Sequence, residues 1–243
     1  MGIVLIILGS ILIFNGALKS NQNFINYGIG GVFLGVVIIS LSDKDTVRFE
    51  IFDVILTSYV DFSKKLINKL NIAGNTVYIP PYENIPHGCM FIPLHSDFDL
   101  DINKLDENEI FNVDIGREKE MGLVLKPFGY ELMKIYEQYL EVDFKNVDIN
   151  YVENISNVLR SLGIPVTLIL EMEDDLLNIS IYHLKINICS EKCRYIQCPI
   201  CSSILLAICK SLNELIEVEK FIVSEDNSIK IVVRRMGGIN EWI

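Results

Sequence analysis

Two long apolar runs open the hydrophobic pattern of the chain, and each predicts a membrane-spanning helix. They cover residues 2–18 and 25–41, and a short polar linker separates them. Each run has 17 residues, which makes about 25 Å of helix against a hydrocarbon core of ~30 Å. Because a helix satisfies its own backbone hydrogen bonds in lipid, we expect a transmembrane helical hairpin over residues 1–42.

Glycine spacing within the two runs predicts that the helices pack against each other. Gly2, Gly9 and Gly16 recur every seven residues, and Gly31 with Gly35 forms a G-x-x-x-G pattern. Small residues allow helix backbones to approach closely in lipid. A cleaved signal peptide is the alternative, but it requires a basic start and a small-residue cleavage site. "MGIVL" has no Lys or Arg and "NGALKS" is a poor cleavage site, so the pattern favours an anchor.

The hydrophobic pattern of residues 43–243 alternates between helical and strand spacing. A helix is predicted to begin at a capping pair, Ser42 with Asp45, and to end near Gly74. Within it, apolar residues recur at helical spacing from Phe49 to Leu70. Further amphipathic helices are predicted over residues 128–142, 150–163 and 199–215.

Strands are predicted between these helices, from short runs bounded by Pro, Asn and Gly. "VTLILEME" and "LLNISIYHLKINI" read as a pair that turns at Asp174 and Asp175, with a bulge near Tyr182 and His183. The single runs are "NTVYIPP", "CMFIPL" and "MGLVLKP", and the closing hairpin is "VEKFIVS" with "SIKIVVRR". We therefore expect an α+β fold in which a mixed antiparallel sheet and helices form a soluble domain over residues 43–243, as one unit or as lobes 43–145 and 146–243.

Charge separates the two parts and excludes one class of partner. Residues 1–42 contain one of the 21 Lys and Arg residues, Lys19, and none of the 32 Asp and Glu residues. The remaining chain therefore carries a net charge of −12. A domain with this negative charge repels the phosphate backbones of nucleic acids. We therefore expect the partners to be the lipid bilayer and a protein or small ligand, and no nucleic acid.

Basic residues near the ends of the apolar runs predict the orientation. Lys44, Arg48, Lys64 and Lys65 follow the second run, whereas the linker carries only Lys19. This bias favours a two-pass protein of the cell membrane with a cytoplasmic C-terminal domain. Six cysteines without a regular disulfide framework also suit a reducing compartment.

Four cysteines within thirteen positions form the main candidate site. Cys189, Cys193, Cys198 and Cys201 are spaced C-x3-C-x4-C-x2-C. Zinc takes four thiolate or imidazole ligands in a tetrahedron, and a compact loop between a strand and a helix could gather these four sulfurs. The second pair of a zinc ribbon usually follows about 12–20 residues after the first, so this spacing is irregular. An iron–sulfur cluster would accept the same ligands, but the spacing matches neither common ferredoxin run.

Two other interpretations of the same cysteines stay open. Pro199 suits the first helical position, which places Cys198 at the helix N-cap, where a thiol pKa falls. "CPIC" resembles the redox motif of the glutaredoxin family, although only 42 residues follow Cys201 and they do not supply that fold. Alternatively, Cys201 and Cys209 lie within a buried helix and are packing residues. The cluster is thus a metal site with zinc as the candidate cofactor, a redox or disulfide pair, or packed thiols.

Two weaker constellations read as structural. Asp97, Asp99 and Asp101 begin like a calcium loop, but its sixth and twelfth positions, Ile102 and Asn108, do not fit an EF-hand. A solvated edge strand explains the three aspartates better.

The second of these constellations is "HGCMFIPLH". It offers His87, Cys89 and His95, for which packing is the better interpretation. We find no catalytic or nucleotide-binding motif in the chain.

The order of parts resembles an archaeal membrane family of unknown function. The shared features are the two apolar helices, "VYIPP", "MFIPL", "GLVLKPFG" and the "CPIC" helix. The last third also resembles V4R domains, which are small-molecule-binding modules with a cysteine zinc site, through "RSLGIPVTLILEME", the strand pair and the cysteine before a helix. V4R-like chains carry more cysteines in the closing hairpin, and "VEKFIVSEDNSIKIVV" has none.

Three functions are compatible with the sequence. The pattern favours a membrane-anchored binding or sensory module over an enzyme, because nothing in it places a base beside a nucleophile. A structural subunit of a membrane complex is the alternative, and an exposed apolar patch on the domain would favour it. A thiol- or metal-dependent enzyme comes third.

Overall fold

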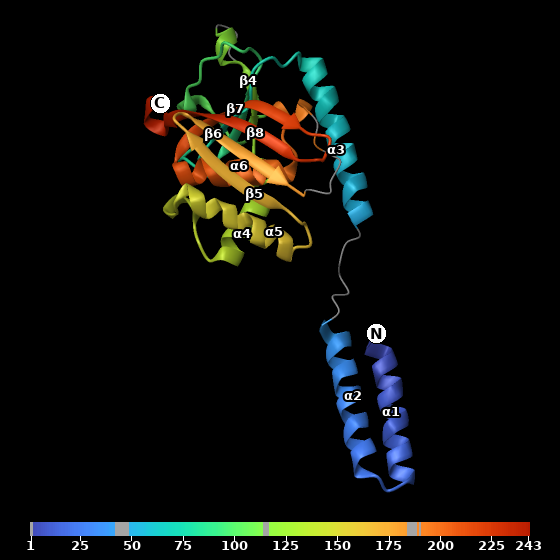
Figure 1. Cartoon of the computed structure of the whole chain (residues 1–243). Coiled ribbons are helices and arrows are strands. Elements are labelled where there is room, and N and C mark those ends of the chain that lie inside the picture. The colour runs from blue at the N-terminus through green and yellow to red at the C-terminus, as the bar shows by residue number, and fades with distance from the viewer. Residues whose placement is uncertain (1, 42–48, 114–116, 184–188, 190) are drawn as a thin grey trace. The chain divides into compact units, whose positions relative to one another are not determined.

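The computed structural model of the chain describes residues 2–41, 49–113, 117–183, 189 and 191–243. The chain forms two compact units, Met1–Ile51 and Phe52–Ile243, which Figure 1 shows in one view. The capping pair expected at Ser42 and Asp45 lies outside the described residues, as do residues 184–188, where a strand was predicted to continue.

The first unit is a pair of packed apolar helices. Helix α1 spans Gly2–Leu18 and α2 spans Gln22–Leu41. A β-carbon at Gly9 would lie 2.7 Å from the carbonyl oxygen of Gly28, and one at Gly35 would lie 2.8 Å from that of Gly2. The two backbones therefore meet through glycines, as predicted, although Gly28 rather than Gly31 forms the closest contact in α2.

Only α2 among the described helices meets the length and composition of a membrane span. Its segment Gln22–Ser40 is long and apolar enough to cross a bilayer. Helix α1 is equally apolar but has 17 residues, which is at the short end of the usual range.

The second unit is an α+β domain built on one sheet. Within the described residues the sheet has eight strands in the order β3-β4-β2-β1-β7-β8-β6-β5, and each neighbouring pair is antiparallel. The strands are β1 (Val77–Ile79), β2 (Cys89–Pro93), β3 (Phe111–Asn112), β4 (Gly122–Leu125), β5 (Thr167–Glu173), β6 (Leu176–Tyr182), β7 (Glu214–Val223) and β8 (Ile229–Gly238). The two halves of the sheet join where β1 pairs with β7.

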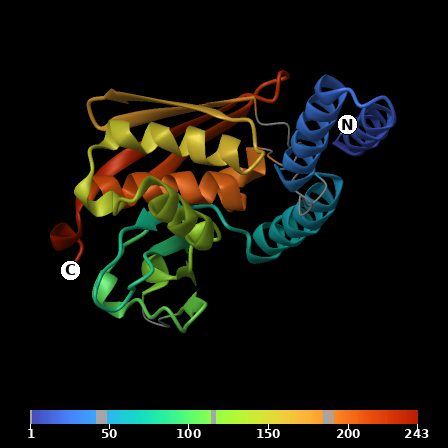
Figure 2. The ribbon, with the colours of Figure 1, turned by 90° about the horizontal axis from the view of Figure 1, so that it is seen from below.

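One face of the sheet is covered by helices, as Figures 1 and 2 show. Helices α4 (Tyr130–Leu140), α5 (Ile155–Ser161) and α6 (Pro199–Leu212) enclose the main core, and α3 (Phe49–Leu70) adds Leu56 and Ile67 to it. Helix α6 is the most buried of them, because every residue from Ile200 to Cys209 is buried. Its N-terminus therefore lies inside the domain, and this position creates the candidate site.

The opposite face of the sheet carries a smaller core. It covers β1, β2 and β4 and is closed by Ile102, Leu105 and the C-terminal Ile239. Ile102 belongs to the 3₁₀ turn η1 (Ile102–Lys104), Leu105 caps that turn, and Ile239 belongs to the turn η6 (Ile239–Glu241). This apolar cluster stabilises the sheet from its second face.

The two sheet edges differ. On β5, the backbone N–H groups of Leu168 and Leu170 donate to the side chains of Ser156 and Glu153, at 2.8 Å each. The edge beside β3 instead exposes Ile110, Phe111 and Val113. Side-chain partners therefore cover part of one edge, whereas apolar groups line the other.

Several predicted boundaries are wrong. Helix α6 ends at Leu212 rather than Leu215, because Asn213 adopts a left-handed conformation and Leu215 already belongs to strand β7, which starts at Glu214. Asp97–Asp101 is not a strand, since the Asp101 carboxylate accepts from the Asn103 N–H and begins the turn η1. Strand β6 ends at Tyr182, before the left-handed His183.

Candidate metal centre

The site begins at the N-terminus of α6. Cys198 is the N-cap, with φ −63° and ψ 157°, and Pro199 occupies the first turn. The carbonyl oxygen of Cys198 accepts a hydrogen bond from the Ser202 N–H at 2.8 Å, and this bond starts the helix. Cys201 lies one turn further, so its thiol faces the same side as that of Cys198. The predicted N-cap is thereby confirmed.

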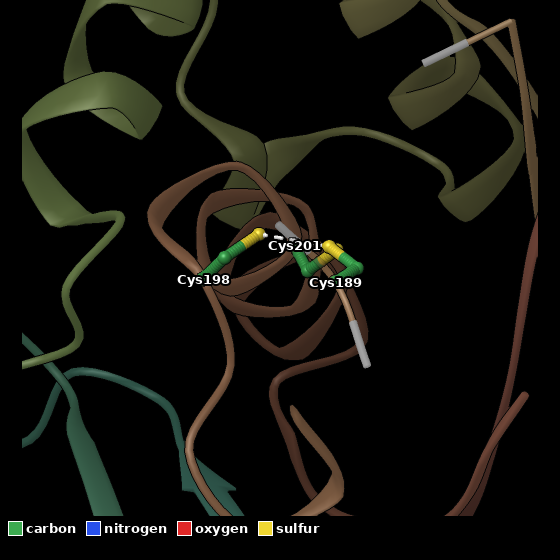
Figure 3. A group of neighbouring side chains, drawn as sticks. All are labelled: Cys189, Cys198 and Cys201. Atoms are coloured by element: carbon green, nitrogen blue, oxygen red, sulfur yellow. Dashed lines mark hydrogen bonds between the residues drawn. The ribbon is translucent and has the colours of Figure 1, made fainter. Parts of the chain in front are cut away.

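A third cysteine reaches these two from the preceding loop. The Cys189 sulfur lies 3.4 Å from the Cys198 sulfur and 3.9 Å from the Cys201 sulfur. All three sulfurs lie within 4.8 Å of one another, and Figure 3 shows the side chains turned toward one another beside the start of α6. These three residues could hold a metal ion.

Cys193 adjoins the cluster. It lies in the 3₁₀ turn η5 (Glu191–Arg194) and is buried. A hydrogen bond with Cys193 is the first cause that raises the pKa of Cys189, ahead of the bonds with Cys198 and Cys201 and of burial. The thiol of the fourth predicted ligand is thus a direct neighbour of the third.

The electrostatics concentrate negative charge on Cys198. Hydrogen bonds from Cys189 and Cys201 hold the pKa of Cys198 well below its usual value, and the N–H groups of Cys201 and Ile200 add to this effect. For Cys201, the bond with Cys189 lowers the pKa, but the bond with Cys198 and burial outweigh it, so the net shift is upward. Metal binding displaces the protons of thiol ligands, so a divalent cation could take the place of the hydrogen bonds among these sulfurs.

Two tyrosines and a glutamine surround the sulfurs. The Tyr59 hydroxyl on α3 donates to the carbonyl oxygen of Gln197 at 2.8 Å, and the Tyr78 hydroxyl on β1 donates to Gln197 Oε1 at 3.0 Å. Burial raises the pKa of both phenols, and the Cys198 and Cys201 sulfurs contribute to the shifts. The sequence pattern did not indicate these three residues.

Cys209 has the packing role that its position predicted. It is fully buried within α6, and its thiol donates to the carbonyl oxygen of Glu214 at 3.2 Å. It belongs to the core rather than to the cysteine cluster.

The structure does not bring the other predicted candidates together. His87 pairs with Glu107, His95 is exposed, and Cys89 is a buried residue of β2 whose pKa is raised to about 12, mainly by burial. Asp97 forms an exposed ion pair with Lys119. Among the described residues, the group of His, Cys, Asp or Glu side chains with metal-binding geometry is the trio of cysteines.

The comparison with protein families identifies the chain at the family level. The model "Domain of unknown function (DUF7982)" matches residues 1–234. The chain belongs to this family. The match agrees with the resemblance to a family of unknown function, whereas the archaeal origin and the V4R resemblance stay predictions. No curated protein and no solved structure matched the chain.

Proposed function

We propose that this protein is a two-pass membrane-anchored binding module whose cytoplasmic domain holds one zinc ion. Cys189, Cys193, Cys198 and Cys201 are its proposed ligands. The observation that carries the proposal is the convergence of three sulfurs, those of the buried Cys198 and Cys201 at the start of α6 and that of the half-buried Cys189 in the preceding loop. Thiolates gathered so closely repel one another unless a cation balances them.

The sulfur separations support zinc. Sulfurs at ~2.3 Å from a tetrahedral zinc lie about 3.8 Å apart, and the separations from Cys189 are 3.4 and 3.9 Å. In this proposal Cys193 is the fourth ligand, and its sulfur joins the three that lie within 4.8 Å of one another. Four thiolates leave no open position, so such an ion would stabilise the domain rather than activate water.

The first unit supports membrane anchoring. The apolar length of α2 and the glycine contacts with α1 suit two helices that pair in lipid. Exposed Leu, Ile and Phe side chains on both helices would face lipid. The basic residues that follow α2 support a cytoplasmic domain.

One observation favours the alternative of a structural subunit. Ile110, Phe111 and Val113 are 50–59% exposed at the β3 edge of the sheet. An apolar edge of this kind suits contact with another protein chain in a membrane complex. Such a role is compatible with a structural zinc.

The zinc proposal is tested on the whole chain, purified in detergent in an oxygen-free buffer without added reductant. We expect about one zinc ion per chain, and we expect Cys198→Ser to lose it and to lower the unfolding temperature. Cys209→Ser is the matched control, because it also alters a buried thiol of α6 but lies outside the cluster. Elemental analysis measures the zinc content, thermal unfolding measures the transition temperature, and thiol titration counts the free cysteines.

The same measurement separates the rival interpretations. Zinc-free wild-type protein that titrates six thiols would indicate packed cysteines. Zinc-free protein that titrates four would indicate a disulfide. Either result would overturn the zinc proposal.

A further inference from the structure

Gln197 joins the cysteine cluster to two distant elements. It is fully buried between Cys193 and Cys198. Its carbonyl oxygen accepts from Tyr59 and its Oε1 accepts from Tyr78, while its Nε2 donates to the carbonyl oxygen of Arg194 at 2.8 Å. Both ends of its side-chain amide are therefore occupied, and one residue ties α3, β1 and the turn η5 together.

The segment before β1 holds the rest of the same loop. The Thr76 hydroxyl donates to the carbonyl oxygen of Tyr195, and Arg194 Nε donates to Asn75 Oδ1 at 2.7 Å. The carbonyl groups of Arg194, Tyr195 and Gln197 thus all take side-chain partners. The path of the chain between Cys193 and Cys198 is therefore fixed by side chains of α3 and of the segment before β1, together with the side chain of Gln197 within the loop.

Helix α3 also contacts this loop through apolar groups. A cavity of only about 10 Å³ remains among Tyr59, Val60, Ile67, Cys193 and Ile196, close to the smallest space that admits one water molecule. Since Leu56 and Ile67 are buried in the main core, this part of α3 is docked on the domain beside the cysteines.

We infer that Tyr59 is a positioning residue that, through its hydrogen bond to the main-chain carbonyl of Gln197, couples the metal centre to the docking of α3. The inference rests on the proposed zinc site and concerns how the docking of α3 regulates its affinity for zinc. The Tyr59–Gln197 bond holds the carbonyl that directly precedes Cys198, so an undocked α3 leaves this ligand less well placed. Coupling between two equilibria is reciprocal, so zinc binding must stabilise α3 docking by the same factor. In the sequence, α3 follows the apolar helix pair. Zinc binding therefore changes the stability of the segment that follows the proposed membrane anchor.

The first test measures zinc affinity in the whole chain, in detergent, by competition with a chelator of known affinity. Tyr59→Phe removes one hydroxyl and keeps the ring. A net hydrogen-bond contribution corresponds to about a two- to tenfold loss of zinc affinity. Tyr136→Phe is the control for the loss of a buried tyrosine hydroxyl, because this hydroxyl bonds to Ser203 of α6 rather than to a carbonyl of the loop before Cys198. The control should lose less zinc affinity than Tyr59→Phe.

The second test measures hydrogen exchange in α3 with and without zinc. Zinc should slow exchange of the amides between Leu56 and Ile67 in the wild type and in Tyr136→Phe. In Tyr59→Phe this protection should shrink by the factor lost in affinity. A merely structural role of the hydroxyl would lower stability without changing the zinc dependence.

The outcomes separate this inference from the zinc proposal. If zinc binds but Tyr59→Phe matches the control in both tests, the coupling is wrong and the zinc site stands. If the wild type binds no zinc, the zinc proposal fails. The alkylation rates of Cys193 and Cys198 in the metal-free chain then decide whether the Tyr59–Gln197 hydrogen bond holds these cysteines in place. Faster alkylation in Tyr59→Phe than in the control supports this positioning role, and equal rates overturn it.

Discussion

Lys210 is the charged residue that most clearly links two helices of the domain. Its ammonium group on α6 lies 2.7 Å from Glu137 and 2.8 Å from Asp143, and only 13% of the Lys210 side chain is exposed. Lys210→Met leaves the Glu137 carboxylate without this partner, so we expect a loss of about 1–3 kcal/mol in unfolding free energy. The exposed pair of Lys119 and Asp97 provides the control, because Lys119→Met should cost less than about 1 kcal/mol. Thermal unfolding of both variants measures this difference, and equal losses would contradict it.

The same ion pair predicts a dependence on pH. The hydrogen bond from Lys210 lowers the pKa of Asp143, so its stabilisation is complete above the unfolded carboxyl pKa of about 3.9 and is lost as pH falls through the lower folded value. The stability difference between the wild type and Lys210→Met should therefore shrink below about pH 4. Because the difference is taken at each pH, changes common to both proteins cancel. A constant difference between pH 6 and pH 3 would contradict the assignment.

Single residues differ in how far the sequence reveals their roles. Cys198 as N-cap and Pro199 in the first turn were predictable, because a cap depends on adjacent residues. Gln197 was not, since its tyrosine partners lie 138 and 119 positions away. Its one local signal is a polar side chain between Ile196 and Cys198, which suggests a buried polar group that needs partners.

At the scale of elements, the contact between α1 and α2 depends on glycine. A β-carbon at Gly9 would lie 2.7 Å from the Gly28 carbonyl oxygen and 2.8 Å from the Val32 nitrogen, both backbone atoms that no rotamer change can move. Gly9→Ala should therefore push the helices apart and cost about 1–3 kcal/mol. Gly30→Ala is the control, because no atom lies within 4 Å of its added carbon. NMR contacts between residues 9 and 28 in a micelle-bound 1–42 peptide should disappear in the first variant only, and their persistence there would contradict this packing.

The elements themselves were largely predictable, whereas their order in the sheet was not. The β5–β6 turn at Asp174 and Asp175 and the β7–β8 hairpin follow from local turn signals. The central pairing of Val77 in β1 with Glu217 in β7 joins strands 140 positions apart, and β1 has only three residues to signal it. The strand predicted at Asp97–Asp101 is wrong, because the Asp101 side chain bonds to the backbone two residues later and starts a turn instead.

At the scale of the whole molecule, the two units differ in charge but belong to one family. The nearly uncharged residues 1–42 precede a domain of net charge −12, and the family model spans both, from residue 1 to 234. The apolar hairpin and the cysteine-bearing domain therefore occur together as one family unit. This combination places the proposed metal centre on a domain that follows an apolar pair of helices in the same chain.

The proposed topology leads to the final prediction. If both termini are cytoplasmic, the α1–α2 linker lies outside the cell membrane. Gln22→Cys at the start of α2, next to the linker, and Glu225→Cys in the β7–β8 turn both place a thiol at an exposed position. In intact cells a membrane-impermeant maleimide should label the first and not the second, because the bilayer protects the domain, and lysis should make both reactive. The wild-type chain, with five buried cysteines and one half-buried cysteine, sets the background. Labelling of Glu225→Cys without lysis would reverse the orientation, and labelling of neither site before lysis would contradict the two-pass arrangement.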